Sequence, residues 1–88
     1  MPMSSAEKRK LKAEAQQLEA VLKIGKNGLS AAFLQSVDQA LTQRGLVKLK
    51  FGDFKDQKKL MAPEIALKTG SELIARVGNV AVFFRPKP

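Results

Sequence analysis

The clearest hydrophobic periodicity lies in the middle third of the chain. Over residues 30–44 the apolar positions recur at intervals of three and four, which predicts an amphipathic helix that ends at Gly45. Over residues 46–51 the pattern changes to strict alternation, with Lys48 and Lys50 on the polar side. This alternation is typical of a strand with one buried face.

The N-terminal segment predicts another helix, basic on its outside. Ser4 and Glu7 form a capping-box pattern, and residues 5–17 are mostly good helix formers. Its apolar positions form one narrow stripe that we expect to face the core, with the basic positions largely off it. The stripe consists of Leu11, Ala15 and Leu18, and the basic positions are Lys8, Arg9 and Lys12.

Shorter signals predict the remaining elements. An apolar run over residues 20–24 stops at a glycine and predicts a buried strand. Residues 56–69 predict a third helix, which Pro63 is expected to kink or split. Residues 72–77 and 80–85 predict two strands joined by a tight Gly-Asn turn.

The order is helix, strand, helix, strand, helix, strand, strand, which indicates an α/β (or α+β) fold. We expect residues 1–88 to form a single domain, with three helices and a four-stranded mixed sheet. The alternating units imply a largely parallel sheet with one antiparallel hairpin strand.

Charge narrows the range of partners. Sixteen Lys and Arg stand against eight Asp and Glu, giving a net charge of +8 and a pI near 10.1. So large an excess on a small surface favours a polyanion. Nucleic acid is the first candidate, because each neutralised phosphate releases a counterion, and an anionic membrane surface is the second.

Several function classes are excluded or disfavoured. The chain contains no cysteine and no histidine, so disulfides, thiolates, imidazole bases and zinc sites are excluded. The acidic residues are scattered and show no catalytic spacing, so we expect no enzyme activity, metal, cofactor or small-molecule substrate. No apolar run approaches the roughly 20 residues that span a bilayer. We therefore expect a soluble, cytoplasmic monomer with no membrane association.

A glycine-bracketed loop is the strongest candidate for the functional element. Gly25, Lys26, Asn27 and Gly28 connect the first strand to the helix that Ser30 can cap. Without side chains at the two glycines, a sugar-phosphate backbone can approach the free N–H groups of the helix start. A GxxG loop of this kind clamps nucleotide backbone in one class of RNA-binding module. The alternative is a tight turn with no further role.

A longer set of motifs resembles a known family. The motifs are Ile24-Gly25-Lys26-Asn27-Gly28-Leu29-Ser30, Ala40-Leu41, Leu46-Val47-Lys48-Leu49-Lys50, Lys68-Thr69-Gly70, Val77-Gly78-Asn79 and Phe84-Arg85-Pro86. Together they resemble the CRM domain, named for chloroplast RNA splicing and ribosome maturation, and in particular its stand-alone bacterial YhbY-like members. The resemblance covers nearly the whole chain.

This resemblance implies an RNA-binding fold related to the C-terminal domain of bacterial translation initiation factor three. It further implies association with ribosomal RNA in precursors of the large ribosomal subunit. Phe84-Arg85 stands where the family usually has a Tyr-Arg pair. The candidate RNA-binding residues are Gly25, Lys26, Asn27, Gly28, Lys23, Lys8, Arg9 and Lys12, with Lys48, Lys50 and Arg85 as secondary candidates.

Other readings stay open at this point. A protein-interaction adaptor could dock an acidic partner on the basic face, with RNA binding incidental, and a duplex-DNA binder is a weaker alternative. The phenylalanines are read as core, with Phe54 alone kept as a candidate for base stacking. Lys55, Lys58 and Lys59 are read as solubilising charge, because no pattern connects them to the loop.

Overall fold

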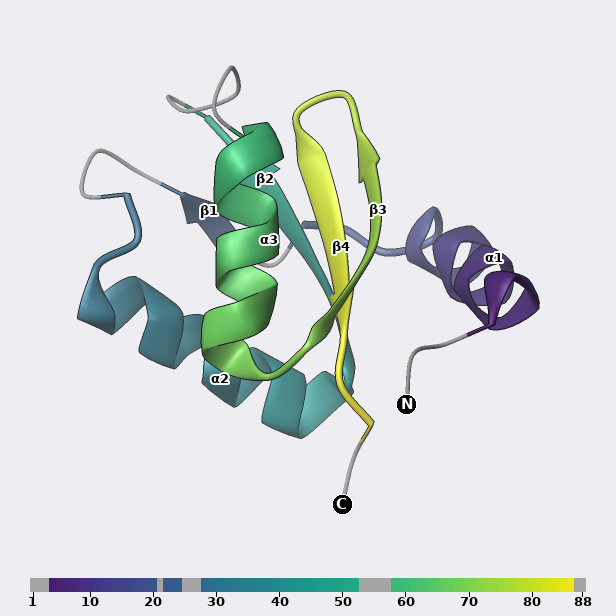
Figure 1. The fold of residues 1–88 in the computed structure, drawn as a ribbon, viewed down its shortest axis with the longest axis horizontal. Coiled ribbons are helices and arrows are strands. Elements are labelled where there is room, and N and C mark those ends of the chain that lie inside the picture. Colours follow the sequence, from purple (N-terminus) through teal and green to yellow (C-terminus); the bar gives the residue numbers. More distant parts are fainter. Residues whose placement is uncertain (1–3, 21, 25–27, 53–57, 87–88) are drawn as a thin grey trace.

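The computed structural model describes residues 4–20, 22–24, 28–52 and 58–86 (Figure 1). It confirms the predicted class, with three helices and one mixed sheet in the expected order. The elements are α1 (Ser5–Ala15), β1 (Leu22–Ile24), α2 (Ala31–Arg44), β2 (Leu46–Phe51), α3 (Lys58–Thr69), β3 (Glu72–Val77) and β4 (Val80–Phe84).

The strands lie in the order β1-β2-β4-β3. β1 and β2 pair in parallel, and β4 runs antiparallel to both of its neighbours, β2 and β3. Three strands therefore share one direction, as expected, and β4 opposes them. The hairpin strand enters the middle of the sheet, so only one pair of neighbours is hydrogen-bonded in parallel.

One face of the sheet packs against α2 and α3 to form the core (Figure 1). The alternation in β2 is confirmed, since Val47, Leu49 and Phe51 are fully buried while Lys50 is exposed. The same face receives side chains of both helices and the neighbouring strands. The rest of this core is Ile24, Val37, Leu41, Ala62, Ile65, Ala81 and Phe83.

α3 corrects the expectation for Pro63, which does not split the helix. α3 continues through Pro63 as one element. Ala62 and Ile65 on either side are fully buried in the core, while Pro63 is exposed. Packing of Ala62 and Ile65 in the core thus keeps α3 helical at Pro63, although proline has no backbone N–H to donate within the helix. Further along the helix, Ala66 packs on the core, whereas the neighbouring Leu67 is 83% exposed.

α1 lies on the opposite face of the sheet, so its apolar stripe does not join the main core. Ala15 is buried there and Leu11 half-buried, but Leu18 lies beyond the end of the helix and is 37% exposed. The helix ends at Ala15, two residues earlier than predicted, in a turn closed by the N–H of Leu18 on the carbonyl of Ala15 at 3.0 Å. The expectation that this stripe faces the core was therefore wrong.

Candidate nucleic-acid interface

The N-terminus of α2 forms the described side of the glycine-bracketed loop. Gly25, Lys26 and Asn27 lie outside the described residues. Gly28 has φ of 61°, a conformation that favours glycine. The hydroxyl of Ser30 accepts the N–H of Phe33 at 3.1 Å and so caps α2, as predicted. The first turn of α2 carries no acidic residue, so no carboxylate competes with an anion for its free N–H groups.

The ends of several described elements lie at one edge of the sheet. The ends of β1 and β2 are neighbours, because Ile24 pairs with Phe51. The carbonyl of Asn79 in the β3–β4 turn accepts the N–H of Phe51 at 2.7 Å. α3 also begins, at Lys58, on this side of the sheet (Figure 1). The topology therefore brings the start of α3 towards the loop, which sequence spacing did not show.

Lys23 and Lys50 lie side by side on neighbouring strands, next to this edge. They are register partners on β1 and β2, and both are exposed. A β-carbon at Gly52 would collide with Cε of Lys23, so the glycine makes room for the lysine stem across the end of β2. Lys23, two residues before Gly25, thus stands beside Lys50, and both are candidate RNA-binding residues.

The cations of α1 lie elsewhere. α1 stands at the β3 side of the sheet, and the loop leaves from the β1 side (Figure 1). Nζ of Lys8 is 3.5 Å from Oε1 of Glu72 on β3, an ion pair that ties α1 to the sheet. Arg9 and Lys12 are exposed. The structure therefore separates the predicted basic helix from the predicted loop.

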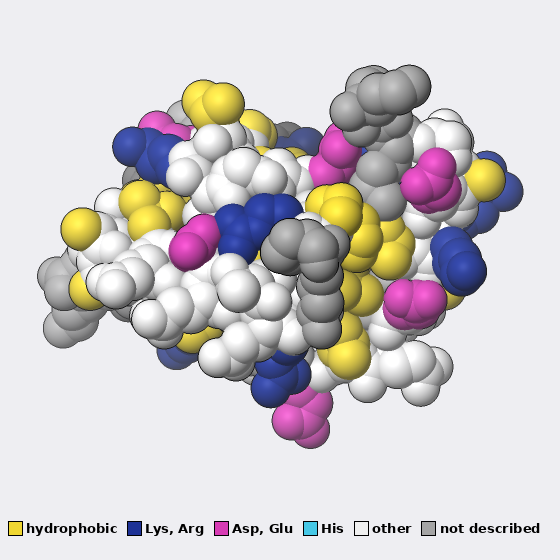
Figure 2. All heavy atoms as spheres, turned by 90° about the horizontal axis from the view of Figure 1, so that it is seen from below, with side chains coloured by type: hydrophobic (Ala, Val, Ile, Leu, Met, Phe, Trp, Pro, Cys, Tyr) yellow, Lys and Arg dark blue, Asp and Glu magenta, His cyan; other side chains and the backbone are white. Residues whose placement is uncertain are grey.

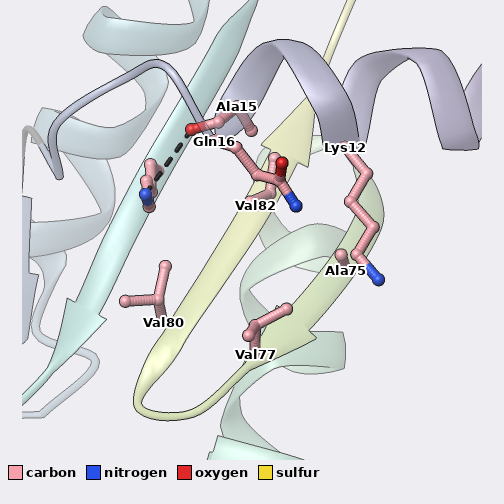
Figure 3. A pocket seen from close by; sticks show the side chains of 8 residues that line it. Lys12, Ala15, Gln16, Ala75, Val77, Val80 and Val82 are labelled. Carbon is pink, nitrogen blue, oxygen red and sulfur yellow. Dashed lines mark hydrogen bonds between the residues drawn. The ribbon is translucent and has the colours of Figure 1, made fainter.

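Lys48 has a structural role that the sequence did not reveal. Its half-buried side chain reaches the end of α1, where Nζ donates to the carbonyls of Leu18 at 3.1 Å and Ala15 at 3.5 Å. The dashed line in Figure 3 marks the bond to Ala15. The carbonyl of Leu18 gains a donor in the turn that follows the helix, and the carbonyl of Ala15 gains a second one beside the N–H of Leu18. A cation at this position also favours the negative end of the helix dipole. Because Nζ of Lys48 donates within the fold, we assign Lys48 to holding the end of α1 rather than to phosphate contact.

Lys48→Met should loosen α1. We expect the free energy of unfolding to fall by about 0.5–1.5 kcal/mol, the usual effect of losing such hydrogen bonds, and amide exchange at the end of α1 to accelerate. Lys50→Met is the matched control, because Lys50 alternates onto the same sheet face but is exposed. It should change stability by less than about 0.5 kcal/mol. Equal losses of stability for the two variants in urea unfolding would contradict the role of Lys48 in holding α1.

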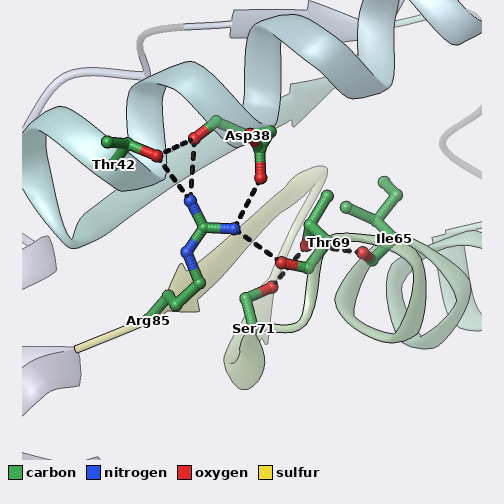
Figure 4. A network of polar contacts seen from close by, with 6 residues as sticks. All are labelled: Asp38, Thr42, Ile65, Thr69, Ser71 and Arg85. Carbon is green, nitrogen blue, oxygen red and sulfur yellow. Dashed lines mark hydrogen bonds and ion pairs between the residues drawn. The ribbon is translucent and has the colours of Figure 1, made fainter. Parts of the chain in front are cut away.

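Arg85 joins α2 to the end of α3. Nη1 donates to Oδ1 of Asp38 at 2.6 Å and to the carbonyl of Thr69 at 2.7 Å, and Nη2 donates to the carbonyl of Asp38 at 2.9 Å and Oγ1 of Thr42 at 2.8 Å (Figure 4). Its backbone N–H donates to the carbonyl of Gly45 at 2.9 Å. With four guanidinium bonds inside the fold, Arg85 is assigned to holding α2 against the end of α3 rather than to phosphate contact.

The face seen from below carries no single positive patch. Figure 2 shows Lys and Arg side chains in separate groups there, with Asp and Glu side chains between them. Among the residues that the structure describes, no three His, Cys, Asp or Glu side chains gather as metal ligands, and no helix is long and apolar enough to cross a membrane. The exposed pair Lys23 and Lys50 at the ends of β1 and β2, and the sheet face that α1 partly covers, are therefore the candidate surfaces.

Comparison with known proteins gives the family. A family model described as the CRS1/YhbY (CRM) domain matches residues 3–85. The chain belongs to this family. The match includes every element of the CRM fold described above, from α1 to β4.

Relatives of this CRM domain occur in archaea and bacteria. It is 36% identical over 83 residues to a "Probable RNA-binding protein" of Methanocaldococcus jannaschii, covering 91% of this chain and 61% of that protein. It is 31% identical over 85 residues to an "RNA-binding protein" of Haemophilus influenzae, covering 96% and 86%. A Pseudomonas aeruginosa "Probable RNA-binding protein" is 26% identical over 89 residues, covering 100% and 86%.

A solved structure shares the fold. The solution structure of a hypothetical protein from Staphylococcus aureus, described there as a candidate RNA-binding protein, superposes with a TM-score of 0.86. The two chains are 27% identical, with 99% of this chain and 92% of the other covered. The arrangement of elements in Figure 1 is therefore shared by the two proteins.

Proposed function

We propose that this CRM domain binds RNA through the β1–α2 loop and the cations beside it, without catalysis. The observation that carries the proposal is the pair Lys23 and Lys50, exposed side by side where the chain leaves β1 for the loop. The acid-free start of α2 offers further N–H groups to the same phosphates. The three relatives named as RNA-binding proteins support the same function.

The mechanism is neutralisation of phosphates in a fixed geometry. Lys23 and Lys26 would contact the backbone at the loop, and the two glycines would allow it to approach closely. Lys8, Arg9 and Lys12 on α1 would contact a more distant part of the same RNA. The net charge of +8 makes this binding strongly dependent on salt.

We further propose that the RNA is ribosomal RNA in precursors of the large subunit, bound in the cytoplasm by a monomer. Holding one RNA conformation until assembly displaces the protein requires binding and release only.

A double variant tests the loop. Lys26→Ala with Gly28→Asp should lower affinity for ribosomal RNA fragments about tenfold or more, the size of one lost charge-assisted contact plus a repelling carboxylate. The slope of log affinity against log salt should flatten by roughly 0.7 to 0.9, one phosphate's worth. Circular dichroism checks that the variant is folded.

The chain offers a matched control at the other edge of the sheet. Lys68→Ala with Gly70→Asp makes the same charge change at the same spacing, and Gly70 has φ of 64° where Gly28 has 61°. We expect this control to bind RNA much more tightly than the loop variant. Equal losses in the two variants would assign the effect to net charge and refute the loop as the RNA clamp.

Sedimentation tests the ribosomal part. At low salt the wild type should travel with large-subunit precursor particles, and nuclease should release it. A protein that never travels with ribosomal particles would refute this part of the proposal, while survival of its complexes under nuclease would indicate a direct protein partner.

A further inference from the structure

A shallow apolar pocket lies between α1 and the second face of the sheet (Figure 3). Its volume is about 150 Å³. Val80 and Val82 of β4 and Val77 of β3 line the sheet side. Helix α1 lines the other side, where Figure 3 shows the Gln16 carboxamide over β4 and the Lys12 side chain reaching towards Ala75. An apolar cavity of this volume is large enough for one benzene-sized ring.

A row of register partners connects this pocket to the loop edge. Lys23 pairs with Lys50, Lys50 with Val80, and Val80 with Val77. Directly paired residues point to the same face of a sheet. The row therefore crosses all four strands on one face, with two exposed lysines on the β1 side and two valines at the pocket. Neighbouring strands lie about 4.8 Å apart, so Lys23 and Val80 are roughly 10 Å from each other.

We propose that the pocket seats one unpaired nucleobase of the RNA whose backbone follows this row. The inference rests on the proposed RNA binding and adds to it a site that reads single-stranded RNA. The valines and Ala75 would contact the face of the ring, and the Gln16 carboxamide, which both donates and accepts, would bond its polar edge. Lys12 lines the pocket, and Lys50 stands beside it as the register partner of Val80. Both lysines are exposed and would complement the phosphates on either side of the base.

The charge around the pocket decides between occupants. An apolar floor alone would suit any hydrophobic group, but Lys12, Lys23 and Lys50 all stand on or beside this face. A base with its two phosphates presents an apolar ring between two negative charges, which matches an apolar floor between cations. An acidic peptide is the alternative occupant, and the experiment below distinguishes it from a base.

The test separates base contacts from phosphate contacts. The probes are a short unstructured RNA and the same strand with abasic sites at its central positions, titrated with wild type and with Ala75→Leu, which fills the pocket without changing charge. Wild type should prefer the strand with bases by about fivefold, the size expected for burying one ring face against aliphatic groups. Ala75→Leu should lose this preference and keep the salt dependence.

Two further variants keep the result interpretable. Val77→Ser trims the wall at a side chain that is already 57% exposed, so it should fold normally and reduce the preference. Gln39→Leu, an exposed position on α2, is the control and should retain it. The proposal is overturned if folded Ala75→Leu and Val77→Ser keep the full preference for bases. It is also overturned if the two variants keep this preference and lose binding of an acidic peptide that the wild type binds. Absence of RNA binding in the wild type itself would refute the proposed function first.

Discussion

Replacing Phe83 by alanine lowers the free energy of unfolding by about 3–5 kcal/mol, the usual cost of truncating a large buried aromatic residue. Phe83 is fully buried at the centre of the sheet, where it pairs with Val47 on β2 and Leu73 on β3. The ring packs among side chains of the neighbouring strands and of α2 and α3, so its removal leaves a cavity that the surroundings can close only in part. Urea unfolding followed by circular dichroism measures the change as a lower midpoint at a similar slope.

The neighbouring residue provides the control. Phe84 points to the opposite face of the sheet and is only half-buried. Phe84→Ala should therefore cost clearly less than Phe83→Ala, about 1–2 kcal/mol. A domain of this size is commonly stable by about 5–15 kcal/mol, so the first variant approaches the limit of folding and the second does not. Similar midpoints for the two variants would contradict the assignment of the core to the face covered by α2 and α3.

Arg85→Lys should destabilise the protein although it conserves the charge. One ammonium cannot reproduce the planar fork that serves Asp38, Thr42 and Thr69 at 2.6–2.9 Å. The Asp38 side chain is 56% exposed, so solvent weakens the ion pair. Most of the loss comes from the carbonyl of Thr69, which loses its donor, whereas the carbonyl of Asp38 keeps the hydroxyl of Thr42 at 3.0 Å. We expect a decrease of about 1.5–3 kcal/mol, seen as a lower melting temperature.

RNA binding distinguishes this structural role from phosphate contact. At a temperature where Arg85→Lys is folded, the salt dependence of RNA binding should equal that of wild type. Arg9→Lys is the matched control for stability, because Arg9 is exposed and should tolerate lysine within about 0.5 kcal/mol. A folded Arg85→Lys variant with a flatter salt slope would return Arg85 to the RNA surface.

Local patterns sufficed for the elements but not for their assembly. The alternation over residues 46–51 and the cap at Ser30 depend on neighbours in the sequence, and both are confirmed. The position of β4 between β2 and β3 depends on which edge the hairpin joins, and spacing carries no information about that. The continuity of α3 through Pro63 likewise depends on a core contributed by distant strands.

The candidate site shows the same division. The motif around the loop marked residues 25–28 from sequence, and the exposed Lys50 follows from the alternation over residues 46–51. Lys23 was marked only by its place beside the loop, and the structure shows that it is exposed. The structural roles of Lys48 and Arg85 could not be predicted, because their partners lie 16 to 47 residues away in the chain. No sequence pattern indicated that Lys48 and Arg85 would donate to carbonyls, or to a carboxylate, of distant parts of the chain.

The irregular pairing of β3 affects how the protein meets other chains. β3 is an edge strand, and its ladder with β4 shifts register between Leu73 and Ala75. An unbroken edge offers a regular row of N–H and C=O groups on which a second protein can add a strand, a common route to aggregation. A bulge twists that row out of line, and the exposed Arg76 adds a charge to it. The edge is thereby protected against strand addition, which matters for a basic protein that RNA could gather at high local concentration.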